Sequence, residues 1–176
     1  MKKILAFIFL LSLTANLYAQ TKETNDYHNV LGATASTYCG QGLMYQYLFN
    51  KDYRLKFAGY YYHSTSNNNY DKSDLYNIGV EFQKTFHQTE STRFYGLAGI
   101  NYYHSNDDYT NTYYPSTSAT SRVMGGAGFG IEFTAWSHLL INFDVGFMYY
   151  NQSYSNNTTN DTYFGIGGGI GIGYLF

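Results

Sequence analysis

Apolar residues recur at every second position in the last stretch of this chain, "YFGIGGGIGIGYLF". Phe164, Ile166, Ile170, Ile172, Tyr174 and Phe176 share one side with Gly168, and the other side carries glycines at 165, 167, 169, 171 and 173. Successive side chains of a β-strand point to opposite faces, so this period of two predicts a strand with one apolar face.

The same period appears in several earlier stretches. It runs through "YRLKFAGYYYH" (53–63), "LYNIGVEFQKTF" (75–86), "VMGGAGFGIEF" (123–133) and "LLINFDVGFMYY" (139–150), whereas "RFYGLAGINYY" (93–103) fits either phase. With "GLMYQYLF" (42–49) and a weaker run at 29–37, the chain has eight candidate strands of about 9 to 14 residues. A membrane-spanning strand needs roughly 9 to 11 residues.

The composition favours strands with apolar outer faces. The chain has 22 Tyr, 13 Phe and 18 Gly, one proline and 12% charged residues. Without Lys2 and Lys3, 8 of the 10 Lys and Arg residues remain against 12 Asp and Glu, a net charge of −4. No basic cluster is present, so nucleic acid is not an expected partner.

The connections between the candidate strands alternate in length. Those at 50–52, 87–92 and 135–137 are short, whereas those at 64–74, 105–121 and 151–161 are long and rich in Asn, Ser, Thr and Tyr. Short turns at one end and long loops at the other are typical of an up-and-down antiparallel barrel with both termini at the short-turn end.

The N-terminus reads as an export signal. Lys2 and Lys3 precede an apolar run from 4 to 13, and Ala19 is a small residue suited to cleavage. We predict a cleaved signal peptide at 1–19, a polar segment at 20–26 and one barrel domain at 27–176. Cys39 lies too far from the cleavage site to carry a lipoprotein anchor and is interpreted as a small buried or loop residue.

From 27 to 176 the chain resembles the small bacterial outer-membrane β-barrels of the OmpA or OmpX kind. The signal sequence, the eight alternating strands and the terminal "GIGYLF" carry the resemblance. It implies an all-β, eight-stranded antiparallel transmembrane barrel in the bacterial outer membrane, with both termini periplasmic. It also implies contact with membrane lipid and lipopolysaccharide, and biogenesis through periplasmic chaperones and the barrel-assembly machinery, with Tyr174 and Phe176 in the assembly signal.

Charged strand residues fall mostly opposite the apolar face. On the lipid face, a basic residue at mid-depth would cost roughly 2 to 4 kcal/mol, so alternation assigns these residues to the lumen. We predict a polar network that fills the lumen, with Lys56 beside Glu81 and Arg93 beside Glu132 on adjacent strands. Its members are Arg54, Lys56, Glu81, Arg93, Arg122, Glu132 and Asp144.

The inner glycines leave an alternative open. Gly126, Gly128, Gly130 and the glycines from 165 to 173 either leave a narrow channel for small solutes or make room for Tyr60, Tyr62 and Met148. Aromatic residues are expected in two girdles at the membrane interfaces. One comprises Phe49, Phe86, Phe133, Trp136, Tyr174 and Phe176, and the other Tyr61, Tyr102, Tyr149 and Tyr163.

Neither an enzyme nor a cofactor is predicted. His63-Ser64 and His104-Ser105 lie near the outer rim with Asp107 and Asp108, but adjacent strand residues point to opposite faces and cannot form a triad. A lipid A-modifying enzyme is therefore the less favoured alternative. No loop matches a calcium-binding pattern. Tyr, Ser and Asn predominate in the long loops, as in binding loops generally, which favours a non-enzymatic role in envelope structure, surface recognition or adhesion.

Overall fold

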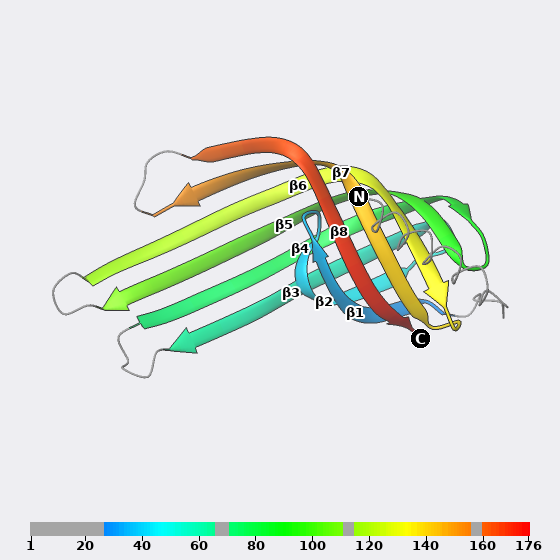
Figure 1. Ribbon diagram of the computed structural model, residues 1–176, viewed down its shortest axis with the longest axis horizontal. Helices are drawn as coiled ribbons and strands as arrows, with labels where there is room; N and C mark the ends of the chain where they lie inside the picture. The colour runs from blue at the N-terminus through cyan, green and yellow to red at the C-terminus, as the bar shows by residue number, and fades with distance from the viewer. Residues whose placement is uncertain (1–26, 66–70, 111–114, 156–159) are drawn as a thin grey trace, which may run out of the picture.

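The computed structural model describes residues 27–65, 71–110, 115–155 and 160–176, and the expected signal peptide and polar segment lie outside this part. Every strand pairs with the next in antiparallel register and β1 pairs with β8, which confirms a closed eight-stranded barrel (Figure 1). The strands are β1 (Asn29–Ser36), β2 (Gly40–Leu48), β3 (Tyr53–Thr65), β4 (Asp71–Gln88), β5 (Thr92–Thr110), β6 (Pro115–Ala135), β7 (Leu139–Tyr154) and β8 (Asp161–Leu175). No described helix is long and apolar enough to cross a membrane.

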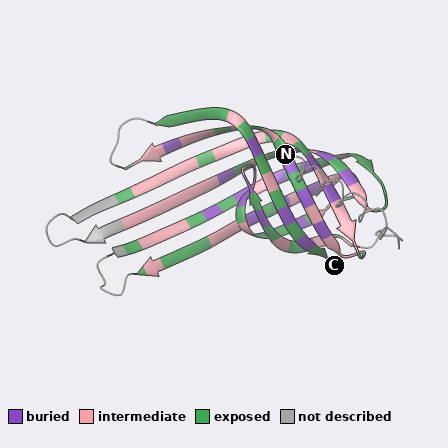
Figure 2. Cartoon of the chain, viewed as in Figure 1, coloured by how far each residue is buried: buried purple, intermediate pink, exposed green. Residues whose placement is uncertain are grey.

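Burial alternates along the strands as the sequence period predicts (Figure 2). In β8, Ile166 is 76% exposed on the outer surface, whereas Gly167 faces inward and is buried. The sequence of β5 fits either orientation, and the structure shows that its odd-numbered residues face inward, because Arg93, Tyr95 and Leu97 are buried inside the barrel. The outer surface of the barrel is consequently apolar and its interior largely polar.

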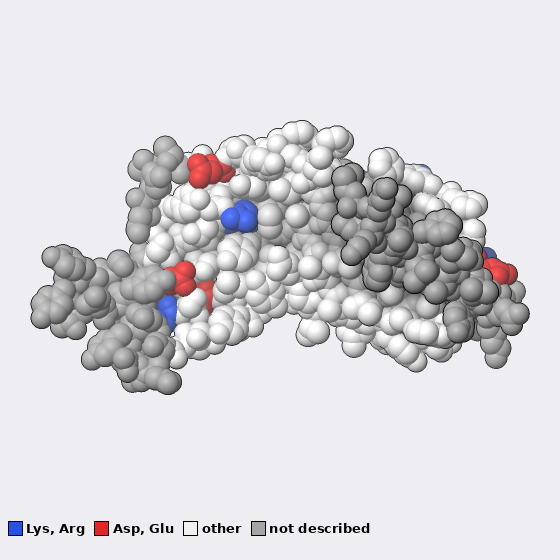
Figure 3. Space-filling model, viewed as in Figure 1, with Lys and Arg blue, Asp and Glu red and all other residues white. Residues whose placement is uncertain are grey.

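An apolar belt of outward side chains surrounds the barrel. Leu43, Phe129, Val145 and Ile166 are each at least 60% exposed. On the visible part of the face in Figure 3, charged groups gather towards the two ends and leave an uncharged surface between them. Water-soluble monomers rarely expose an apolar surface of this extent, whereas membrane barrels present one to lipid.

The prediction that Tyr163 belongs to an outward aromatic girdle is wrong. Tyr163 has the inward phase of β8, where its ring stacks on that of Tyr150 with the centroids 5.4 Å apart. Its neighbour Phe164 takes the outward position and stacks on Phe147. Tyr163 therefore belongs to the inner surface, because the strict alternation of β8 continues through it.

The expectation of three long loops is wrong in extent. The pairing of β3 with β4 reaches as far as Thr65 opposite Lys72, and that of β5 with β6 reaches as far as Thr110 opposite Pro115. The segments within 64–74, 105–121 and 151–161 that the structure describes are therefore largely strand, with 66–70, 111–114 and 156–159 outside the described residues. Thr, Ser and Tyr have good strand propensity, and a sheet in water tolerates polar side chains on both faces, so a polar composition did not mark the strand ends.

β1 and β2 are much shorter than the other strands. The register of β1 with β8 ends at Gly169, and that of β2 with β3 ends at Gly59. Beyond these points, β3 to β8 continue as an open six-stranded sheet, here called the extension (Figure 1). The opposite end of the barrel, where β1 begins and β8 ends, is called the termini end.

Candidate functional site in the lumen and the extension

The first layer of lumen charge lies near the termini end. Glu132 accepts hydrogen bonds from Arg54 Nη1 at 2.7 Å, Arg93 Nε at 3.1 Å and Arg93 Nη2 at 2.9 Å. All three side chains are nearly inaccessible to solvent. The Arg93 guanidinium also lies 4.1 Å from the centroid of the Tyr95 ring, a cation–π distance. Two cations share one carboxylate, so this layer carries an excess of one positive charge.

The second layer lies deeper in the barrel and has the opposite balance. Lys56 Nζ lies 2.6 Å from Glu81 Oε1 and 3.4 Å from Asp144 Oδ2, so one cation serves two carboxylates. Tyr95 donates a 2.6 Å hydrogen bond to Asp144. Gln83 joins the layers, because its amide donates to Glu81 and its carbonyl oxygen accepts from Arg93.

The structure brings together six of the seven network residues expected from the sequence. The pairs Lys56 with Glu81 and Arg93 with Glu132 face each other in the strand register. Arg122 lies apart in the extension, where its Nε donates a 2.7 Å hydrogen bond to Gln152. The contact between Arg54 and Glu132 crosses the barrel from β3 to β6, and strand adjacency does not reveal such a pair.

Several polar members of the network were missed. Gln83 and Asn142 have the inward phase, and the pattern already placed them on that face. Tyr95 was missed because the phase of β5 could not be read from its mixed apolar sequence. A tyrosine two positions from an inward arginine was the available signal.

The turn between β1 and β2 folds into the lumen. Tyr38 and Cys39 have no exposed surface. The carbonyl of Thr37 accepts a 2.8 Å hydrogen bond from Asn101 of β5, and the Thr37 amide donates to the Gly168 carbonyl at 3.0 Å. The turn is thus tied to opposite walls of the barrel, and Cys39 is the small buried residue expected.

The inner glycines make room for this turn and for the charged layers. A Cβ on Gly126 would lie 2.9 Å from the Tyr38 ring, and one on Gly99 would lie 2.7 Å from the Tyr38 carbonyl oxygen. A Cβ on Gly130 would meet the ring of Tyr95. These glycines permit close approach across the lumen, and their missing side-chain volume is occupied by other residues.

The inward surface of the extension is rich in tyrosine and open to water. Tyr62 is 56% exposed and Tyr163 is 48% exposed, although both have the inward phase. The Arg122 guanidinium lies between aromatic rings, 5.0 Å from the centroid of Tyr150 and 5.8 Å from that of Tyr103. Among the described side chains, no carboxylate forms an ion pair with Arg122.

The histidines near the outer rim lie on the outer face of the extension. His63 Nδ1 lies 2.7 Å from Asp74 Oδ1, and its Nε2 lies 3.1 Å from Thr65 Oγ1. The hydrogen bonds from His63 and Tyr61 lower the pKa of the Asp74 carboxyl. Sequence adjacency pointed to Ser64 and missed both Asp74 on the neighbouring strand and Thr65 two residues along the same strand. The side chains of His63 and Asp74 are 49% and 40% exposed on an open surface, whereas an enzyme site usually lies in a concave pocket.

His104 contacts a different serine from the one beside it. Its Nδ1 lies 2.9 Å from Ser121 Oγ of β6. Asp107 instead accepts a 3.4 Å hydrogen bond from Ser105, and the side chain of Asp108 lies outside the described part. Within the described ranges, no three His, Cys, Asp or Glu side chains form a group that could hold a metal ion.

The two residues of the expected assembly signal lie at the termini end. Tyr174 faces outward and stacks on His138, with the centroids 5.0 Å apart. The Phe176 amide donates a 2.9 Å hydrogen bond to the Asn29 carbonyl, which extends the pairing of the first and last strands. Recognition of these residues by an assembly machinery stays a prediction.

Comparison with solved structures finds small barrels. Ail, the attachment invasion locus protein of Yersinia pestis, is 18% identical with a TM-score of 0.43, covering 85% of this chain and 94% of that chain. The N-terminal β-barrel domain of Pseudomonas aeruginosa OprF is 16% identical with a TM-score of 0.43, covering 86% and 98%. Acinetobacter baumannii CarO is 11% identical with a TM-score of 0.41, covering 88% and 100%.

These likenesses concern the fold alone, which the strand pairing of this chain establishes independently. No protein-family model and no curated protein matches the chain.

Proposed function

We propose that this protein is a non-enzymatic outer-membrane barrel with a filled lumen, which recognises a surface partner through its extension. The apolar belt supports the membrane location, because lipid can surround strands only when the sheet closes and its outer face is apolar. The short turns after β2, β4 and β6 lie at the same end of the barrel as Asn29 and Phe176, whose backbones pair, which supports a periplasmic position for that end.

The filled lumen supports a role other than diffusion through a pore. Two charged layers and the inward turn at 37–39 occupy successive depths of the barrel. An eight-stranded barrel is just wide enough for its own side chains to fill it. A narrow channel for small solutes is the first alternative function, and an enzyme that modifies lipid A is a less favoured second alternative.

The single observation that carries recognition is the inward surface of the extension. Its tyrosines offer large contact areas at low cost in conformational entropy, and its polar side chains can adapt their hydrogen bonds. Arg122 adds a cation that is held by Gln152 and two aromatic rings. A positioned cation among aromatic rings suits a partner with both polar and flat apolar surfaces.

The test measures adhesion of cells that display the protein to host cells and to purified envelope components. In one variant, a short turn replaces residues 105–120. In the second, Arg122→Gln removes the inward cation, and Lys72→Gln on the exposed outward face of the same extension is the control. We expect the first two variants to lose adhesion and the control to keep it. Equal adhesion by all variants, with equal surface amounts, would contradict the proposal.

A further inference from the structure

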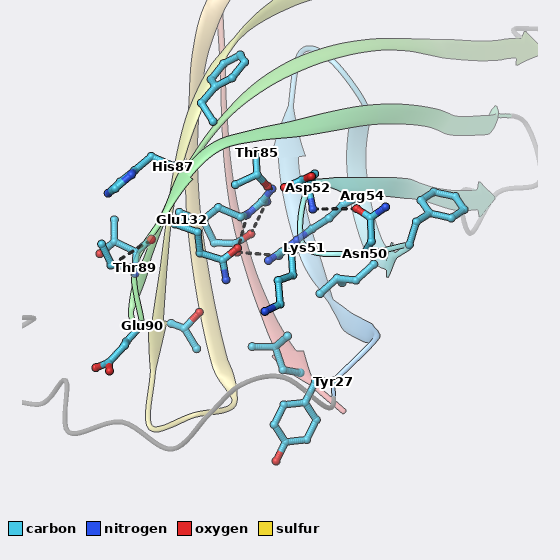
Figure 4. Close-up of a pocket in the computed structure, with 18 of the residues that line it drawn as sticks. Tyr27, Asn50, Lys51, Asp52, Arg54, Thr85, His87, Thr89, Glu90 and Glu132 are labelled. Carbon is cyan, nitrogen blue, oxygen red and sulfur yellow. Dashed lines mark hydrogen bonds and ion pairs between the residues drawn. The ribbon is translucent and has the colours of Figure 1, made fainter.

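A cavity of about 930 Å³ opens at the termini end of the barrel. Its walls come from the turns between β2 and β3 and between β4 and β5, together with Tyr27 and His28 ahead of β1. Arg54 and Glu132 lie at its inner end (Figure 4), and Arg93, which donates to Glu132, also lines it. Apolar side chains also line it, including Leu48, Phe49 and Leu175.

The two arginines at the inner end differ in how fully they are bonded. Arg93 donates to Glu132, Thr85 and Gln83 through Nε and both terminal nitrogens. Arg54 donates one hydrogen bond among the described residues, from Nη1 to Glu132. Its Nε has no hydrogen-bond partner in the part of the chain that the structure describes, and only 7% of the Arg54 side chain is exposed. Arg54 is therefore a buried cation with N–H groups that donate no hydrogen bond to the described residues.

The charge order along the lumen also favours an anion in this cavity. The layer that lines the cavity has two cations and one carboxylate, whereas the layer with Lys56, Glu81 and Asp144 has the opposite excess. The uncharged Gln83 lies between the two layers and is hydrogen-bonded to both. Coulomb energy falls with distance, so an anion beside Arg54 experiences the positive layer more strongly than the deeper negative one.

The rim of the cavity adds little to this balance. Lys51 and Asp52 follow one another on the turn between β2 and β3, and Glu90 lies on the turn between β4 and β5. All three residues are exposed, so water and salt screen their charges. The buried inner end, with its lower effective dielectric, therefore determines what the cavity binds.

We propose that this cavity binds a small oxyanion, a carboxylate or a phosphate, whose oxygens accept hydrogen bonds from the Arg54 guanidinium. The planar fork of arginine suits two oxygens of such a group. The apolar wall accommodates a short apolar substituent on the anion, so a lipid-derived or other alkyl-bearing anion binds more tightly than the free ion. This site is separate from the extension and does not depend on the partner proposed for it.

The experiment uses the full barrel folded in nanodiscs and titrates it with three probes at constant ionic strength. The probes are inorganic phosphate, acetate and butyl phosphate, and the readout is the amide NMR shifts of Thr85, Arg93 and Glu132. We expect saturable shifts in the millimolar range, with butyl phosphate binding more tightly than inorganic phosphate. Equal affinities for these two would assign the site to the free anion and overturn the role of the apolar wall.

The variant Arg54→Gln removes the donor group, and Lys84→Gln removes one exposed positive charge outside the cavity. We expect Arg54→Gln to weaken binding at least about tenfold, as for loss of a charged hydrogen-bond donor, and Lys84→Gln to leave it unchanged. Folding of each variant is checked from its NMR spectrum, and Arg54→Lys, which keeps the charge without the fork, replaces Arg54→Gln if that variant fails to fold. Absence of saturable shifts in the wild type, or equal affinity in Arg54→Gln, would overturn the proposal.

Discussion

Replacing Glu132 with glutamine is the sharpest test of the charged layers. The carboxylate accepts three hydrogen bonds from two buried arginines, at 2.7, 2.9 and 3.1 Å. Glu132→Gln keeps the size of the side chain, removes its negative charge and turns one of its two acceptors into a donor. The Arg54 and Arg93 guanidiniums then lie side by side without a counter-ion.

The expected cost follows from the burial of the three groups. Removing one partner of a buried ion pair destabilises a protein by about 3 to 5 kcal/mol, because the remaining charge stays in a medium of low dielectric. Here one substitution deprives two cations of their carboxylate. We therefore expect the free energy of unfolding to fall by about 3 to 5 kcal/mol.

The assay is urea unfolding of the barrel in lipid vesicles, followed by the fluorescence of Trp136, the only tryptophan. The control is Glu90→Gln, which removes an exposed carboxylate from the turn between β4 and β5 and should change the free energy by less than about 0.5 kcal/mol. Equal effects of the two substitutions would refute the role given to the network. A large change in conductance with an intact fold in Glu132→Gln would equally refute the filled lumen.

Three further predictions concern the inward turn, the extension and the absence of lipid-modifying activity. A Cβ in Gly79→Ala would lie against the Cys39 carbonyl, so we expect faster maleimide labelling of the Cys39 thiol than in wild type or in Gly125→Ala, where the nearest atom to the Cβ is the Gly99 carbonyl oxygen at an ordinary contact distance of 3.4 Å. The lowered pKa of Asp74 means that its contribution to stability is present above the ordinary value of 3.8 and lost as pH falls through its folded pKa. Amide protection factors, which correct for the intrinsic exchange rate, should therefore fall on acidification near Asp74 in the β3–β4 hairpin, and should fall less in His63→Ala, which lacks one of the two hydrogen bonds. Mass spectra of lipid A and phospholipids should be identical in cells lacking and overproducing the protein, and a changed acyl chain would contradict a non-enzymatic role.

The barrel could be predicted from the sequence because the strands show a clear alternation of apolar and polar residues. Alternation specifies which face of each strand meets lipid, and a register slip of one residue would reverse every side chain, so the inward positions of Lys56, Glu81 and Asp144 could be read directly. The limits of the strands could not be read, because polar residues such as Ser73 and Thr120 pair as well in a water-exposed sheet as they serve in loops. Composition therefore predicted loops where the extension has strands.

The arrangement within the lumen needed the closed structure. Contacts such as Arg54 with Glu132 join strands that are not neighbours, and they depend on the diameter and stagger of the barrel. The inward turn at Tyr38 is likewise invisible in the sequence, because a short connection between two weakly patterned strands carries no sign of its direction. The glycines opposite it had two interpretations until Tyr38 was found to occupy the space beside Gly126.

The most direct test of the filled lumen is single-channel recording of the folded protein in a planar lipid bilayer, beside a variant that lacks the inward turn at 37–39. We expect no stable conductance steps for the wild-type barrel and an increase in ion flow once the turn is removed. Reproducible, long-lived openings of the wild-type protein would contradict it and would make the narrow channel the correct function.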